Sequence, residues 1–362
     1  IPLMGYSTII HIFSVLVLIC LLLNFNKFLK IKYFYVLVFF LIQVVVSAIV
    51  GFYFSDYSFN YEVLSQSIIL FYYLLIYSCL GFYLNYYKLV GSKIWLFFLY
   101  LFLLTVICLY FKTGDFSFYF ELMNPNVVTI NYQEVSSIFL FVWFFYYVGV
   151  NDGAERFKSI LIAFLILLSS GARSEFFGFI ITLLYVVLLS NLRLNLSKIK
   201  SIIILLVIVT ALVVCFGDFL INIFENSRHF SVIKLDDDSS WQEREVLKQK
   251  NLQNIYQNPI FGNYASHFEI GRGSYIHNIL SSWQQFGLSG FILYALLILI
   301  PFITLSIYKV KHDTKEIDGF LFISTYCLTL IFVTKSVYWV YLGFSIGSFL
   351  YFCYKYKKGI LR

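Results

Sequence analysis

Runs of about twenty apolar residues recur along almost the whole chain, and they constrain its fold more than any other feature. Only 12% of the 362 residues are charged, whereas a soluble domain carries roughly 25%. Inside a bilayer every backbone polar group must be paired within the protein, and an α-helix satisfies its own. The sequence therefore predicts an all-α polytopic integral membrane protein.

The apolar runs predict about eleven transmembrane helices, and the whole chain, 1–362, is expected to form one membrane domain. The expected spans are 6–25, 33–54, 63–86, 94–111, 135–150, 159–170, 176–190, 201–223, 288–308, 319–334 and 336–354. The first run is followed by Asn26 and Lys27 instead of a small-residue cleavage site, which indicates a span and not a signal peptide. The sixth and seventh spans are short, so one broken helix is the alternative interpretation there.

Basic residues are distributed unevenly among the connections between these spans. If alternate connections starting with 26–32 face the cytoplasm, that side holds 17 of the 26 basic residues but only 5 of the 19 acids. This agrees with the preference of lysine and arginine for the cytoplasmic side. Joining the sixth and seventh spans would move Arg193, Lys198 and Lys200 to the opposite side. We therefore keep the two spans separate and expect a cytoplasmic C-terminus.

The net charge of +7 is explained by this orientation signal and by attraction to anionic lipid, so no nucleic-acid partner is expected. The six cysteines lie in or beside apolar runs and form neither Cys-x-x-Cys nor Cys/His spacings. Such cysteines are typical of small buried hydrophobic residues. The acidic run 236–238 lacks the alternating ligands of a calcium loop. We therefore expect no disulfide and no metal site.

One predicted connection is long, 224–287 on the outer face, and long connections often carry function. Within it Ser240 and Glu243 match a capping box, which predicts a helix running to about Tyr256. Pro259 then ends the helix, because proline disfavours helical geometry in the preceding residue. Three polar residues share one face of this helix: Arg244, Lys248 and Asn251.

A second helix in this connection is predicted to begin near Ser274, a residue type that suits an N-cap. His277 then falls in the first turn, where free backbone N–H groups disfavour a charged imidazole. A neutral His277 is suited to accept a proton, and the alternative is a hydrogen-bonded interfacial histidine without a catalytic role. His229 and His267 lie in the same connection without a comparable setting.

Arg173 stands in a turn of small residues between the two short spans. An arginine at the membrane boundary is costly unless it pairs or faces water. It is therefore a candidate functional residue, and the alternatives are snorkelling to the headgroups or pairing with Glu175. For Arg244 the corresponding alternative is a solvated helix face.

Three polar elements follow one another in the second half of the chain. They are Ser170-Gly171-Ala172-Arg173-Ser174, then Arg244 followed by Asn258-Pro259-Ile260-Phe261-Gly262, then Tyr275-Ile276-His277-Asn278 with Gly287. This ordered set resembles the bacterial O-antigen polymerase and O-antigen ligase superfamily, the Wzy and WaaL types. The many-span layout and the single long connection agree with the resemblance, whereas the first five spans carry no matching motif.

The resemblance implies a glycosyltransferase of GT-C-like architecture in the bacterial inner membrane. The connection 224–287 would be a large periplasmic loop that carries short helices and the active site. Donor and acceptor would both be undecaprenyl-pyrophosphate-linked oligosaccharides, with no nucleotide sugar, cofactor or obligatory metal. A chain-length regulator protein is a further candidate partner.

Carried over to this sequence, the resemblance gives catalytic roles to His277, Arg173 and Arg244. Two arginines can clamp a diphosphate through their forked N–H donors. A neutral histidine can act as general base on the acceptor hydroxyl, which contributes roughly 100- to 10,000-fold to the rate. Direct attack would invert the anomeric carbon. Further substrate contacts are expected from five residues: Arg272, Lys248, Asn278, Tyr275 and Glu175.

Within this superfamily the chain fits a polymerase better than a ligase, because it is short, rich in Phe, Tyr and Ile, and matches the ligase pattern only loosely. A polymerase joins lipid-linked repeats, whereas a ligase transfers the glycan to a lipid A core sugar. The alternative from another class is a lipid-linked oligosaccharide flippase or transporter. Such a protein is expected to show internal repeats and interrupted helices, but only Pro301 lies within a span and no repeat is seen.

Overall fold

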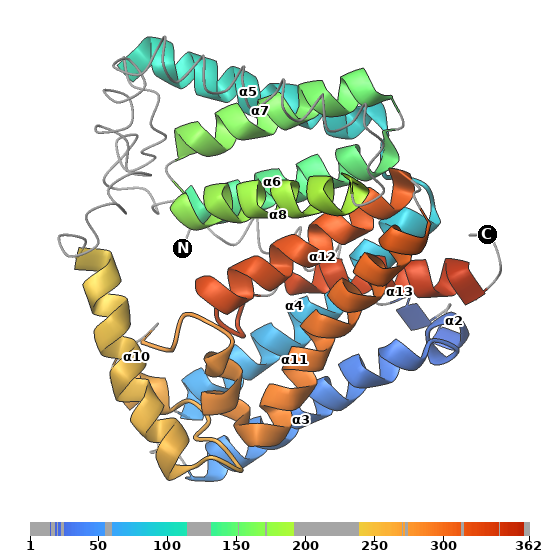
Figure 1. Cartoon of the computed structure of the whole chain (residues 1–362). Coiled ribbons are helices and arrows are strands. Elements are labelled where there is room, and N and C mark those ends of the chain that lie inside the picture. Colours follow the sequence, from blue (N-terminus) through green and yellow to red (C-terminus); the bar gives the residue numbers. More distant parts are fainter. Residues whose placement is uncertain are drawn as a thin grey trace. The chain divides into compact units, whose positions relative to one another are not determined.

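The computed structural model describes residues 15, 19, 21–22, 25–54, 60–113, 132–150, 152–170, 172–191, 239–269, 271, 274–312, 315–339 and 341–357. Within these ranges the regular elements are helices and no strand occurs (Figure 1). The prediction of an all-α fold is confirmed for this part of the chain.

The helices follow the apolar runs of the sequence. Those before the long connection are α2 (Phe25–Leu29), α3 (Lys32–Phe54), α4 (Asn60–Tyr86), α5 (Lys93–Thr113), α6 (Tyr132–Gly149), α7 (Gly153–Ser170) and α8 (Arg173–Asn191). The later ones are α10 (Ser239–Gln257), the short 3₁₀ helix η4 (Ser266–Glu269), α11 (Leu280–Lys311), α12 (Lys315–Val333) and α13 (Leu342–Lys357). The sixth and seventh expected spans are therefore separate helices. The expected span 201–223, and most of 6–25, lie outside the described residues.

Five helices of the described part are long and apolar enough to cross a bilayer. They are Lys32–Phe54, Leu64–Tyr86, Arg173–Ser190, Leu280–Lys311 and Glu316–Val333. Large apolar side chains such as Phe39 and Phe97 are more than half exposed, at 57% and 60%. Extensive exposed apolar surface of this kind is typical of contact with lipid. The helices thus indicate a membrane-embedded protein.

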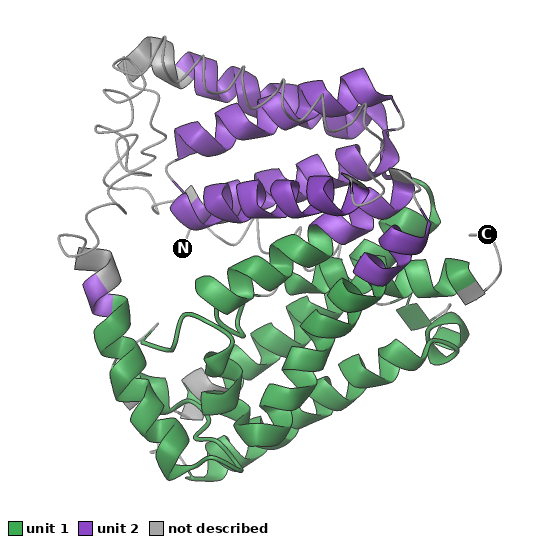
Figure 2. Ribbon diagram, in the orientation of Figure 1, with its two compact units in different colours: residues 1–89, 244–304, 323–362 green, residues 90–243, 305–322 purple. Residues whose placement is uncertain are grey.

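The first of two compact units comprises residues 1–89, 244–304 and 323–362 (Figure 2). In it α13 packs tightly on α4, because a Cβ on Gly347 would overlap the carbonyl oxygen of Ser78. Small residues allow membrane helices to approach this closely. The Tyr33 hydroxyl of α3 donates to the Leu297 carbonyl of α11 at 2.6 Å. These contacts build the helical scaffold on which the candidate site lies.

The second unit comprises residues 90–243 and 305–322 (Figure 2). Its core is centred on Trp143 of α6, which is fully buried. The Trp143 ring lies 5.1 Å from that of Phe179 and 4.9 Å from that of Phe322. Its indole N–H donates to the Ser159 carbonyl at 2.9 Å. Aromatic packing of this type holds α6, α7, α8 and the first part of α12 together.

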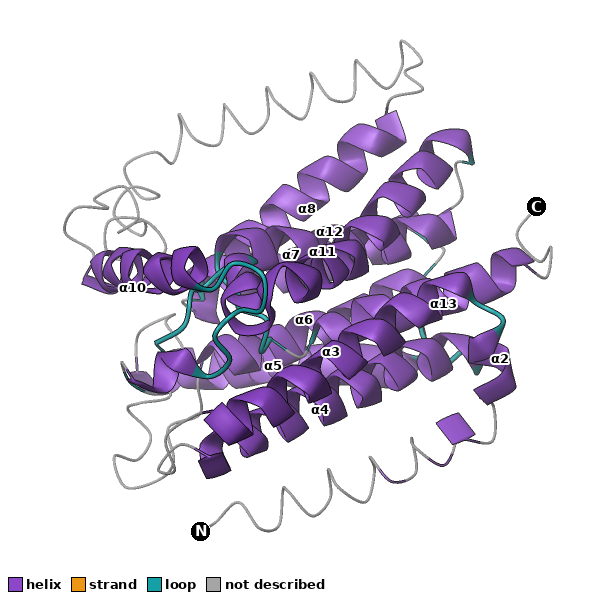
Figure 3. Ribbon diagram, turned by 90° about the horizontal axis from the view of Figure 1, so that it is seen from below, coloured by secondary structure: helices purple, strands orange, loops and turns teal. Residues whose placement is uncertain are grey.

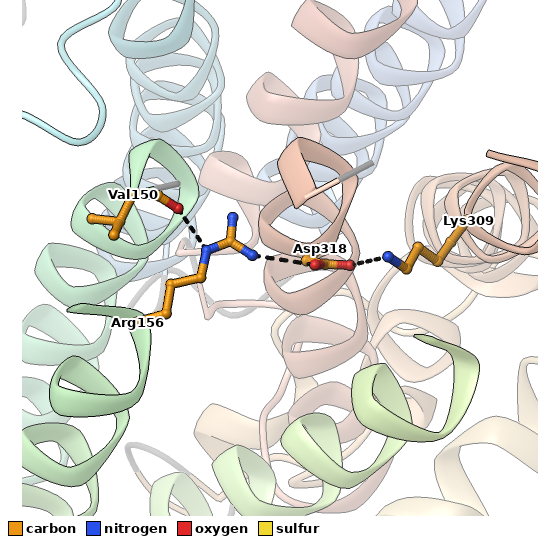
Figure 4. A network of polar contacts seen from close by, with 4 residues as sticks. All are labelled: Val150, Arg156, Lys309 and Asp318. Carbon is orange, nitrogen blue, oxygen red and sulfur yellow. Dashed lines mark hydrogen bonds and ion pairs between the residues drawn. The ribbon is translucent and has the colours of Figure 1, made fainter. Parts of the chain in front are cut away.

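Unit 2 also contains two buried cations that share one carboxylate (Figure 4). Asp318 lies 2.6 Å from the Lys309 ammonium and 3.2 Å from Nη1 of Arg156. Nε of Arg156 donates to the Val150 carbonyl at 2.6 Å. Asp318 stands in the first turn of α12 and Lys309 in the last turn of α11, where each complements the helix dipole. This cluster joins the ends of three helices.

Candidate functional site

Helix α10 supplies the first wall of a polar region in unit 1. It ends at Gln257, directly before Asn258 and Pro259, as predicted. Asn251 on this helix is fully buried. Its amide donates to the Ser274 carbonyl at 2.7 Å, and its carbonyl oxygen accepts from Gln284 of α11 at 2.5 Å. Asn251 therefore fastens α10 both to the loop before α11 and to α11 itself.

The loop that follows α10 packs on α11 through two glycines. Gly262 and Gly287 both have positive φ, +73° and +69°, and a Cβ on either would overlap the backbone of the other segment. Asn263 N–H donates to the Gln284 carbonyl at 2.7 Å, and the Trp283 indole N–H donates to the Pro259 carbonyl at 2.8 Å. The Asn-Pro-x-x-Gly element and the downstream glycine of the sequence motifs are thus two sides of one contact. This contact holds the loop 258–279 beside α10 (Figure 3).

Helix α11 begins at Leu280, so the prediction of a helix start near Ser274 is wrong. The Ser274 carbonyl accepts from Asn251, and Asn278 is the N-cap instead: its side-chain oxygen accepts from the Leu280 N–H at 2.9 Å. His277 consequently precedes the N-cap and does not lie in the first helical turn. Asn278, expected to contact substrate, has a defined structural role in starting α11.

His277 nevertheless lies where its neutral form is favoured. Burial lowers the pKa of its imidazole, and the nearby charges of Arg244 and Lys335 lower it further, to about 4. Arg244 comes from α10 and Lys335 from the connection between α12 and α13. Two cations from separate elements therefore act on one neutral imidazole.

Aromatic rings line the same region. The ring of Tyr275 lies 5.0 Å from that of His277, 5.6 Å from that of His267 and 5.4 Å from that of Tyr338. Tyr338 O–H donates at 3.2 Å to the side-chain oxygen of Gln285 in α11. Tyr275 thus stands between two histidines, which gives this predicted substrate contact a central position in the cluster.

His267 is fully buried, and burial lowers the pKa of its imidazole to about 4. The side-chain oxygen of Gln285 accepts from the Ala265 N–H at 2.7 Å, so the Gln285 amide nitrogen is a donor to Nδ1 of His267 at 3.2 Å. The neutral ring then carries its proton on Nε2, which has no hydrogen-bond partner among the described residues. His267 is therefore a second neutral histidine of this cluster.

Of the remaining predicted residues in the long connection, Arg244 is half-buried on the face of α10 that carries Asn251. It forms no ion pair with a carboxylate within the described part of the chain. Lys248 instead pairs with Glu245 at 3.2 Å on a partly exposed surface. Arg272 lies outside the described residues. Arg244 is thus the cation of α10 that acts on His277.

The predicted site residues Arg173 and Glu175 belong to unit 2. Arg173 opens α8 and is half-buried. Glu175, in the first turn of α8, is fully buried and accepts hydrogen bonds from the Ser174 hydroxyl at 2.6 Å and the Ser137 hydroxyl at 3.3 Å. These bonds satisfy a buried carboxylate in the first turn, where the helix dipole also favours it.

Lys335 and His267 were not among the residues predicted from the sequence. Lys335 offered one signal, because it is a lone lysine between two apolar runs on the side assigned few basic residues. His267 offered none, since it is buried against Tyr275, Gln285 and Tyr338 from other segments of the chain. In the described part of the chain no three His, Cys, Asp or Glu side chains are placed to hold a metal ion. Comparisons with protein-family models, curated proteins and solved structures gave no match.

Proposed function

We propose that this protein is a membrane glycosyltransferase that joins polyprenyl-pyrophosphate-linked oligosaccharides, an O-antigen polymerase. The observation that carries the proposal is the polar cluster of unit 1, in which the ring of Tyr275 lies between those of His277 and His267, and the charges of Arg244 and Lys335 help to keep His277 neutral. The surrounding helices are apolar enough for a membrane. A neutral base beside cations suits the transfer of a glycosyl group from a phosphate leaving group.

In the proposed reaction the acceptor hydroxyl oxygen attacks the anomeric carbon of the donor. The bond between that carbon and the phosphate oxygen breaks, and its electron pair leaves with the diphosphate. Nε2 or Nδ1 of His277 takes the proton of the hydroxyl, while Arg244 balances the charge on the leaving group. A single displacement of this kind inverts the anomeric centre. The sequence resemblance, and not the geometry of unit 1, gives Arg173 as a further proposed phosphate ligand, with Glu175 orienting it.

We also propose that the chain crosses the inner membrane eleven times and has a cytoplasmic C-terminus. The loop 224–287 would be periplasmic and would present His277 to lipid-linked substrates. Tyr275 would stack on a sugar, and Arg272 and Lys248 would contact phosphate. The docking of the loop after α10 on α11 supports the proposed positions of Tyr275 and His277, because it holds this part of the chain beside the start of a long apolar helix.

The test is to purify the protein and supply synthetic undecaprenyl-pyrophosphate-linked repeat units in vesicles. Lipid-linked products longer by whole repeats are expected. Transfer only to an added lipid A core acceptor would identify a ligase instead. Transbilayer movement of the lipid without any new glycosidic bond would refute the proposal and favour a flippase.

A further inference from the structure

Lys335 lies in the connection 334–341, which is fastened to the start of α11. Its backbone N–H donates to the Leu330 carbonyl at 2.8 Å, which closes the C-terminal end of α12. Two residues on, the Val337 N–H donates to the Ser281 hydroxyl of α11 at 2.7 Å. This bond places the connection against the helical turn that follows His277.

Further contacts fix the same arrangement from the aromatic side. Tyr338 reaches Gln285 through its hydroxyl and lies 5.4 Å, ring to ring, from Tyr275, which in turn lies 5.0 Å from His277. Asn251 independently fastens the helix that carries Arg244 to this loop. Arg244 and Lys335, whose charges act on the imidazole of His277, therefore lie on two elements that are anchored separately.

We propose that Lys335 and Arg244 together bind the diphosphate of the lipid-linked donor beside His277. This inference rests on the proposed function and adds a phosphate ligand that no sequence motif contains. The chemistry of the two side chains is complementary: a guanidinium offers a planar fork to one phosphate, and an ammonium acts as a compact point charge on another.

Anion binding at this place also changes the base. Among the described residues, the charged groups that act on His277 are Arg244 from α10 and Lys335 from the connection 334–341. Its titratable neighbours there are Tyr275 and, beyond it, His267 and Tyr338. The first two turns of α11 carry no charged residue. A bound diphosphate offsets both cations, so it raises the pKa of His277 towards the range in which a general base is effective. The base would thus gain strength only when the donor is present.

The experiment is a titration of the full-length, histidine-labelled protein in detergent with inorganic pyrophosphate, followed by the NMR signals of the imidazoles. The wild type is expected to bind pyrophosphate saturably, with a rise in the pKa of His277. Lys335→Gln should weaken binding by about tenfold or more, the loss expected for one charge-assisted contact. Lys335→Arg, which keeps the charge, should retain most of the affinity for pyrophosphate. Lys250→Gln, on an exposed part of α10, should bind pyrophosphate like the wild type.

Wild-type affinity in Lys335→Gln, or no pyrophosphate binding by the folded wild type, would overturn the inference. Inorganic phosphate is titrated in parallel because a lipid headgroup presents a single phosphate, and equal affinity for both anions would overturn the assignment to a diphosphate. The elongation assay separates this result from the proposed function. If Lys335→Gln elongates with an unchanged donor KM, the role of Lys335 is refuted and the proposed function stands. If the wild type binds pyrophosphate but does not elongate, the polymerase function is refuted and the binding site stands.

Discussion

In unit 2, Arg156 and Lys309 share the carboxylate of Asp318, whereas in unit 1 Arg244 and Lys335 act on the imidazole of His277. The first arrangement balances its cations with a carboxylate inside the protein and joins the ends of three helices. The second brings the charges of two cations, one on α10 and one on the connection 334–341, to a neutral imidazole. Cations that share a buried carboxylate serve the fold, whereas cations beside a neutral base suit the anionic substrate that we propose.

The largest effect expected from this comparison is on chemistry in unit 1. His277→Gln should lower the elongation rate by about 100- to 10,000-fold, because the general base is lost. The unfolding temperature at neutral pH should change little, since the half-buried imidazole of His277 packs on the Tyr275 ring and forms no hydrogen bond within the described part of the chain. His312→Gln, at the exposed end of α11, is the matched control and should elongate normally. Wild-type glycan ladders from His277→Gln would remove this residue from the mechanism.

In unit 2 the expected effect is on stability and not on elongation. Asp318→Asn leaves two buried cations without a balancing charge and should destabilise the protein by about 3–5 kcal/mol. The elongation rate per folded molecule should remain close to that of the wild type. Thermal unfolding in detergent measures the first quantity, and the assay with lipid-linked repeats measures the second. An unchanged unfolding temperature would mean that this cluster does not stabilise the helix ends.

A smaller effect is expected where the loop is attached to α11. Gly287→Ala forces a side chain into a backbone conformation that costs about 1–3 kcal/mol, and its Cβ also overlaps the Ile260 carbonyl. Both stability and elongation should fall, because the loop 258–279 can no longer pack as it does. Gly153→Ala, at an open position, is the control. If Gly287→Ala behaves like Gly153→Ala, the glycine contact does not position the site.

The last effect concerns pH. An unfolded histidine binds a proton below about pH 6.5, whereas folded His267 and His277 do so only below about pH 4. The two histidines therefore do not lower the free energy of unfolding above about pH 6.5. As the pH falls from there towards 4, they lower it by about 1.4 kcal/mol per histidine and pH unit. Unfolding temperatures at pH 7 and pH 5 should thus differ more for the wild type than for His277→Gln. An equal difference would mean that His277 is not held neutral by the fold.

Much of the scaffold follows from the sequence, because apolar runs and a single proline fixed most helix bounds, including the end of α10 at Gln257. The start of α11 did not, since Ser274 and Asn278 both suit an N-cap and the choice depends on Asn251 taking the Ser274 carbonyl. His277 and Arg244 could be selected from sequence motifs. Lys335 and His267 could not, because their positions depend on contacts between distant segments.

The most direct test is to measure elongation and unfolding temperature together for Arg244→Gln in the reconstituted protein. If unit 1 gathers cations for an anionic substrate, this variant should lose at least about tenfold in elongation, the value of one charge-assisted phosphate contact, and keep the wild-type unfolding temperature. Wild-type elongation, or a loss of stability like that of Asp318→Asn, would contradict it.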